Sequence, residues 1–97
     1  IVGGLDKEII KRYIKMNLNK VAFCYEHELL AHPTMEGTVE VQFFISPSGV
    51  VTSATGKGFD PTVSECVAGV VNRIQFPKPE DGGGVNVNYP FNFHATK

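Results

Sequence analysis

Apolar residues recur at three- and four-residue steps over residues 6–32, which is the spacing of one face of an α-helix. This stripe consists of Ile10, Ile14, Leu18, Val21, Tyr25 and Leu29. Asp6 can cap the first free amides of such a helix, and Pro33 ends it. Asn17 and Asn19 weaken the middle because short polar side chains compete for backbone hydrogen bonds. The pattern predicts one long helix with a bend or break near these asparagines.

After Gly37 the apolar period changes to two, as in a half-buried strand. The alternating apolar residues are Val39, Val41, Phe43 and Ile45. Pro47 presets φ and Gly49 can adopt positive φ, so residues 46–49 have the composition of a turn. Residues 50–55 are then predicted to return as the second arm of a hairpin.

A second helix is predicted to begin at Asp60-Pro61, a capping residue followed by a proline at the first helical position. Its apolar stripe consists of Val63, Cys66, Val67, Val70, Val71 and Ile74, and the two prolines in residues 76–79 end it. Gly69 lies in mid-helix, where a missing side chain can permit close approach to a neighbouring element.

The last segment has the longest strand pattern in the chain. Val85, Val87, Tyr89, Phe91 and Phe93 alternate with Asn86, Asn88, Pro90, Asn92 and His94. Pro90 has no N–H to donate, so it cannot bond in ladders on both sides. We therefore expect this strand at the edge of its sheet.

These elements predict a two-layer α+β domain in the order helix, strand, strand, helix, strand. Each strand has one apolar and one mostly polar face, so both helices are expected on the same face of a three-stranded antiparallel sheet. The most apolar strand, over residues 39–45, is expected in the centre, giving the strand order 2-1-3 and an exposed edge on the third strand. Residues 1–97 form a single domain in this interpretation, with residues 1–5 as a linker remnant.

Composition narrows the function. Nine basic and ten acidic residues give a net charge of -1, which lacks the excess of cations that phosphate backbones require, so nucleic acid is not expected as a partner. Five of the nine cations, Lys7, Lys11, Arg12, Lys15 and Lys20, lie in the first twenty residues, and a solvated helix face is favoured over a membrane or acidic-partner patch. No run is long enough to span a bilayer, and the possibility of an anchor or export signal upstream of Ile1 stays open.

The two cysteines lie on the two apolar stripes and are plausible disulfide partners. Cys24 sits between Val21 and Tyr25, and a bridge to Cys66 would stabilise the domain by about 4 kcal/mol in the chain-entropy model. Two buried thiols that pack as small hydrophobic groups are the alternative. The residues alone leave both open, because they do not give the redox compartment.

No arrangement of residues indicates catalysis, a metal or a cofactor. The first four residues resemble the activated N-terminus of a trypsin-like protease, but no Gly-Asp-Ser-Gly-type nucleophile segment accompanies them. Cys24, His27, His32 and His94 are poorly spaced for zinc. Glycines 82–84 lead into a strand, so they lack the helix N-terminus of a phosphate loop. We therefore predict a protein that is not an enzyme.

Several motifs together resemble the TonB C-terminal-like domains, and among them the AgmX/PglI C-terminal family of myxobacterial and related proteins. They are Phe23-Cys24-Tyr25-Glu26, the hairpin pattern G-x-V-x-V-x-F-x-I-x-P-x-G-x-V over residues 37–51, Glu65-Cys66-Val67, Phe76-Pro77 and Tyr89-Pro90-Phe91-Asn92-Phe93. The likeness covers nearly the whole chain. Two departures are that Ile74 and Gln75 replace an aromatic residue before Phe-Pro, and that the upstream Tyr-Pro segment of transport-type TonB is missing.

This resemblance implies a periplasmic domain on a protein tethered to the inner membrane, which transmits force to envelope partners, in a gliding-motility setting for the AgmX/PglI type. It implies binding of a partner's extended segment along the last strand, at Asn86, Val87, Asn88, Tyr89, Phe91, Asn92 and His94. A periplasmic location also implies a Cys24–Cys66 disulfide. One alternative is a structural domain that self-associates through the same edge as a weak homodimer. The other is a thiol redox enzyme.

Overall fold

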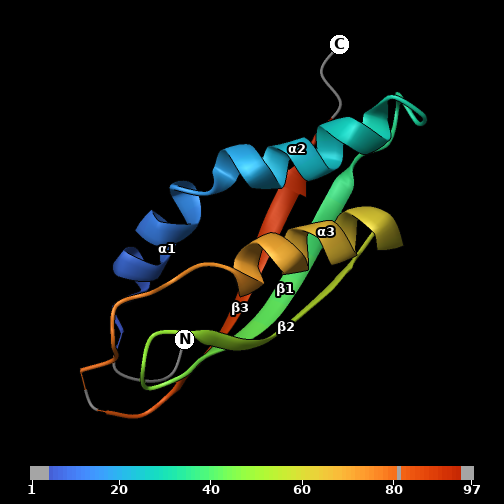
Figure 1. The fold of residues 1–97 in the computed structure, drawn as a ribbon. Helices are drawn as coiled ribbons and strands as arrows, with labels where there is room; N and C mark the ends of the chain where they lie inside the picture. Colours follow the sequence, from blue (N-terminus) through green and yellow to red (C-terminus); the bar gives the residue numbers. More distant parts are fainter. Residues whose placement is uncertain (1–4, 81, 95–97) are drawn as a thin grey trace.

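The computed structural model describes residues 5–80 and 82–94, which form three helices and one three-stranded sheet (Figure 1). In chain order the elements are α1 (Lys7–Lys15), α2 (Leu18–Leu29), β1 (Gly37–Ile45), β2 (Val51–Gly58), α3 (Pro61–Asn72) and β3 (Val85–Phe93). The helices lie over one face of the sheet, so the molecule is a two-layer α+β fold (Figure 1). Within the described ranges, no helix has both the length and the apolar character to cross a membrane.

The sheet has the predicted strand order, β2-β1-β3, with both pairs antiparallel. β3 runs alongside the whole of β1, from Gly37 opposite Phe93 to Ile45 opposite Val85. β2 begins one residue later than predicted and continues to Gly58 instead of ending at Thr55. The glycines near its end gave no apolar alternation for the sequence pattern to detect. β1 is therefore the central strand, and β3 has one described neighbour.

The predicted long N-terminal helix is in fact two helices, because the chain breaks at Met16 and Asn17. The Asn17 side-chain amide donates to the Tyr13 carbonyl at 2.9 Å. The Asn17 backbone N–H donates to the Ile14 carbonyl, three residues back, instead of four as in an α-helix. α2 then begins with Asn17 as its N-cap. The break falls where competition from the asparagine side chain was expected.

The core lies between the sheet and the helices. It includes Ile10, Ile14, Val21, Val39, Val41, Ile45, Val63, Val67, Val71, Phe76 and Val85, each at most 2% exposed. Burial alternates strictly along β1 and nearly so along β3, which confirms that the sheet is covered on one side. Leu5, placed by sequence in a linker remnant, is 6% exposed and packs in this core; residues 1–4, including the protease-like start, lie outside the described residues.

α3 packs closely on β2, and the glycine that permits this is not the predicted one. A Cβ on Gly56 of β2 would lie 2.5 Å from the Ser64 carbonyl oxygen of α3, whereas a Cβ on Gly69 would meet nothing within 4 Å. The start of α3 is fixed by Asp60, whose carboxylate accepts from the Val63 N–H at 2.9 Å. The glycine that lets α3 and β2 approach closely therefore belongs to the strand and not to the helix.

A disulfide joins α2 to α3. Cys24 and Cys66 have an S–S distance of 2.05 Å and a Cα–Cα distance of 5.7 Å. Cys24 is 3% exposed and buried, as its place on an apolar stripe predicts. Cys66 is exposed, so its placement on the buried stripe of the second helix is wrong. The bridge runs from the core to the surface of the helical layer.

Candidate functional site

The outer side of β3 is the candidate site, and its backbone geometry follows from the strand register. Val41 is opposite Tyr89, Glu40 opposite Pro90 and Val39 opposite Phe91. Along an antiparallel ladder, residue pairs that exchange backbone hydrogen bonds alternate with pairs that do not. Because Pro90 has no N–H to donate, we place it in a pair without hydrogen bonds. Its backbone therefore faces away from β1.

The same alternation extends along the strand. Asn86, Asn88 and Asn92 share the parity of Pro90, so their N–H and C=O groups also face outward. A second chain arriving at this edge would find four carbonyls and three N–H groups, with the missing donor at Pro90. This is a row of unmet backbone bonds of the kind that binds an added strand.

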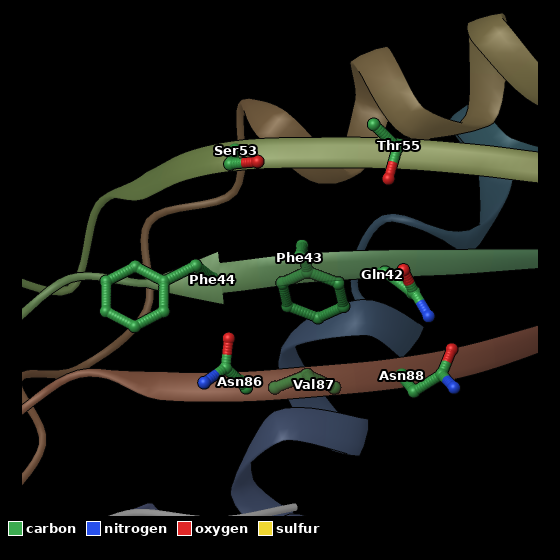
Figure 2. Close-up of a pocket in the computed structure, with 8 residues that line it drawn as sticks. All are labelled: Gln42, Phe43, Phe44, Ser53, Thr55, Asn86, Val87 and Asn88. Atoms are coloured by element: carbon green, nitrogen blue, oxygen red, sulfur yellow. The ribbon is translucent and has the colours of Figure 1, made fainter.

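The open face of the sheet carries a shallow hollow next to this edge. Figure 2 shows Gln42 and Phe44 of β1 standing between side chains of β2 and β3. Gln42 is opposite Thr55 and Asn88, and Phe44 is opposite Ser53 and Asn86. These six residues, with Phe43 and Val87 behind them, line a shallow hollow of about 430 Å³ (Figure 2). Amides and hydroxyls dominate it, so it presents hydrogen-bonding groups without charge.

On the other face, a groove of about 380 Å³ separates α2 from the C-terminal half of β3. Its helix side is apolar and consists of Leu18, Val21 and Ala22, and its strand side consists of residues 89–93. Leu18 is 43% exposed although it belongs to the apolar stripe of the helix. The edge of β3 is thus flanked by a polar hollow on one face and an apolar groove on the other.

The structure divides the seven residues predicted for this site into four groups. Asn86, Asn88 and Asn92 are exposed and combine outward backbone with open-face side chains. Val87 and Phe91 are 4% and 5% exposed, so their side chains belong to the core and are not available to a partner. Tyr89 is half-buried and lines the groove with α2. His94 is exposed and follows the end of the strand.

Sequence reasoning missed the parts of the site outside β3. The sequence pattern predicts Leu18 only as part of the apolar stripe of a helix. It gives no signal that places Ala22, Gln42, Ser53 or Thr55 beside the strand edge. The exposed amides opposite one another could have been found from the predicted strand order, since Gln42 and Asn88 share a face. The groove could not, because it depends on the path of α2 over β3.

Other reactive groups in the described part of the chain are engaged or dispersed. Both cysteines are in the disulfide, and no three His, Cys, Asp or Glu side chains gather as metal ligands within residues 5–80 and 82–94. The Tyr25 hydroxyl donates to the Met35 carbonyl, and burial, aided by the negative charge of Glu36, raises the pKa of Tyr25 above its usual value. Tyr25 therefore acts in packing, where its ring stacks on Phe93 at 4.9 Å.

The molecule is thus a small α+β domain with an accessible sheet edge. Comparison with known proteins gives few relatives: no protein-family model matches the chain, and no solved structure matches it. Among curated proteins, the tyrosine-protein kinase MasK of Myxococcus xanthus (strain DK1622) is 28% identical over 95 residues. The match covers 97% of this chain and 14% of the kinase, so the chain is similar to one segment of a much longer protein.

Proposed function

We propose that this chain is a protein-interaction module that binds an extended segment of a partner by adding it as a strand beside β3. The observation that carries the proposal is the outward backbone row of Asn86, Asn88, Pro90 and Asn92, which has no described strand beside it. Backbone bonds to this row would provide affinity, and side-chain contacts on the two flanking faces would provide selectivity.

The flanking faces indicate what the partner segment looks like. Side chains of an added strand alternate between the two faces of the sheet, so every second one would enter the groove beneath Leu18 and Ala22. The remaining side chains of the added strand would lie on the open face of the sheet, beside Asn88 and Asn92. We therefore infer a segment that alternates apolar and polar residues, with one apolar residue near Tyr89.

The setting proposed for this module is the periplasm, within a longer protein anchored in the inner membrane and transmitting force to envelope proteins. Two observations support it: the Cys24–Cys66 disulfide suits an oxidising compartment, and the motifs resemble AgmX/PglI-type TonB-like domains. Nucleic acid and cofactors have no part in this proposal.

The name of the matched protein suggests a place for such a module beside a signalling domain. This chain has neither the His-Arg-Asp nor the Asp-Phe-Gly motif of a protein kinase. Kinase chemistry in a longer protein of this kind would therefore reside in another segment, and these 97 residues would contribute binding.

The decisive experiment compares two substitutions at one outward-facing residue. Asn88→Pro removes an outward N–H without breaking the ladder to β1, while Asn88→Ala keeps the N–H and removes only the side chain. Loss of one backbone bond predicts about a two- to tenfold weaker Kd for Asn88→Pro, with a larger loss where the ring obstructs the strand. Asn88→Ala should stay near wild type.

The assay is titration of isotope-labelled protein with extended peptides from periplasmic segments of candidate envelope proteins, followed by backbone amide shifts. We expect shifts at Asn86, Asn88, Asn92 and Ala22. Equal binding by the two Asn88 variants, or shifts confined to α1 and α3, would contradict strand addition at β3.

A further inference from the structure

Charge is strongly segregated between α1 and the rest of the chain. α1 carries four cations and one acid, a formal charge of +3 over nine residues. The other residues carry five cations and nine acids, a formal charge of -4, and together the two parts give the total of -1. A helix of this charge on a mildly acidic domain forms a basic patch.

The cations of α1 are exposed and almost unpaired. Ile10 and Ile14 bury one face of the helix, and Arg12 and Lys15 lie off that face and are exposed. Lys7 is exposed in the first turn, three residues before Ile10. Lys11 approaches Glu8 at 3.9 Å, an exposed pair that neutralises little. Within residues 5–80 and 82–94, Lys7, Arg12 and Lys15 make no ion pair with any described residue.

An exposed apolar side chain completes this patch. Lys11, Arg12, Lys15 and Met16 surround a shallow hollow of about 440 Å³ together with Glu8. Met16 is 71% exposed because the break between α1 and α2 turns it away from the core. A flexible thioether among cations suits an interface of anionic headgroups and acyl chains, where the cations bind phosphate and the apolar group enters between lipids.

We propose that the α1 basic face, formed by Lys7, Lys11, Arg12, Lys15 and Met16, docks the domain onto an anionic phospholipid surface. An acidic protein is less well matched, because the hollow is shallow and its exposed Met16 would need a defined apolar pocket on that partner. The inference is independent of strand addition at β3, which uses none of these residues. It assigns the domain a second contact, with a bilayer.

The test is co-sedimentation of the disulfide-intact chain with vesicles. Vesicles of phosphatidylcholine with about 30% phosphatidylglycerol should bind the chain at about 0.05 M NaCl and release most of it at about 0.3 M, because salt screens the attraction. Pure phosphatidylcholine vesicles should not bind it. Each Lys or Arg near the surface is expected to contribute about fivefold to partitioning.

Matched charge reversals make the test specific. Lys11→Glu/Lys15→Glu should reduce binding at least about twenty-five-fold, and Met16→Ser should reduce it by a smaller factor that salt does not change. Lys57→Glu/Lys78→Glu makes the same change in net charge at exposed positions outside α1 and should retain most of the binding. Circular dichroism of each variant verifies the fold.

Two outcomes would overturn the proposal. Equal loss in the two double variants would assign any binding to net charge and not to this face. Failure to bind phosphatidylglycerol vesicles, with binding to a polyglutamate peptide instead, would assign the face to acidic polypeptides.

Discussion

Two glycines illustrate how differently the same residue type can act at the scale of a single position. Gly56 lies where α3 presses on β2, and Gly69 lies on the open side of α3. The sequence pattern singles out Gly69 as a site of close approach and ends the predicted strand before Gly56. Only the distance to the facing backbone separates a required glycine from a dispensable one.

We predict opposite stability effects of the same substitution at these positions. Gly56→Ala places a Cβ 2.5 Å from the Ser64 carbonyl oxygen and should lower the free energy of unfolding by about 1–3 kcal/mol. Gly69→Ala, in an open helical position, should raise it by about 0.5–1 kcal/mol. Urea unfolding of both variants measures this. Equal destabilisation would contradict the assigned packing.

Tyr25 provides a pH-dependent prediction. Burial and the nearby Glu36 charge raise the pKa of Tyr25 in the folded state, so the unfolded chain loses the hydroxyl proton at lower pH than the folded one. The stabilisation is therefore complete below the unfolded pKa of about 10 and declines as pH rises above it. Tyr25→Phe removes this contribution together with the bond to the Met35 carbonyl.

At neutral pH, the free energy of unfolding of wild type should exceed that of Tyr25→Phe by about 0.5–1.5 kcal/mol. The difference should shrink above about pH 10. A difference that is constant with pH would show that the hydroxyl does not couple folding to this titration.

At the scale of elements, the helical layer depends on a covalent connection as well as on packing. α3 contacts β2 along its length, whereas α2 is joined to α3 through the Cys24–Cys66 disulfide. The bridge also positions the groove, because Val21 and Ala22 precede Cys24 in the same helix. The disulfide is therefore expected to support both stability and the site.

Removal of this disulfide should have a large effect on stability. Cys24→Ala/Cys66→Ala is expected to lower the free energy of unfolding by about 2–4 kcal/mol, since the bridge joins positions 42 residues apart. Thermal and urea unfolding provide the measurement. A reducing agent should destabilise wild type by a similar amount and leave the double variant unchanged; no response of wild type to reduction would contradict the prediction.

At the scale of the whole molecule, an exposed sheet edge invites pairing with a second copy as well as with a partner. Pro90 removes one donor from the middle of this edge, and the adjoining open-face side chains are exposed asparagines with little apolar area. These features disfavour pairing of β3 with a second copy of the chain. They leave most outward N–H and C=O groups of β3 free to bond a partner strand. We therefore expect homodimerisation through β3 to be weaker than binding of a partner segment.

We predict that the chain sediments as a monomer over a range of concentrations and that Pro90→Val shifts it toward dimers. The substitution completes the outward row of N–H groups without altering the ladder to β1. Analytical ultracentrifugation gives the measurement, with Asn72→Val on α3 as a control for an added apolar side chain. Concentration-dependent association of the wild type would instead favour the self-associating structural domain.

The sequence by itself determined the strand order, the one-sided burial of the sheet and the edge position of β3. The order follows from the high apolar content of residues 39–45, the one-sided burial from alternation along each strand, and the edge position from the missing N–H of Pro90. All three are properties of short stretches of sequence. It also located the weak point of the first helix, because the Asn17 amide competes with the backbone only a few residues away.

Tertiary structure alone decided the features that depend on distance between remote segments. The exposure of Cys66, the contact of Gly56 with Ser64 and the groove between Ala22 and β3 each arise where chain segments meet. Periodicity states which face of an element is apolar, but not the path of a helix across a sheet. The path of α2 places an apolar groove beside the predicted strand edge, on the face opposite the polar hollow.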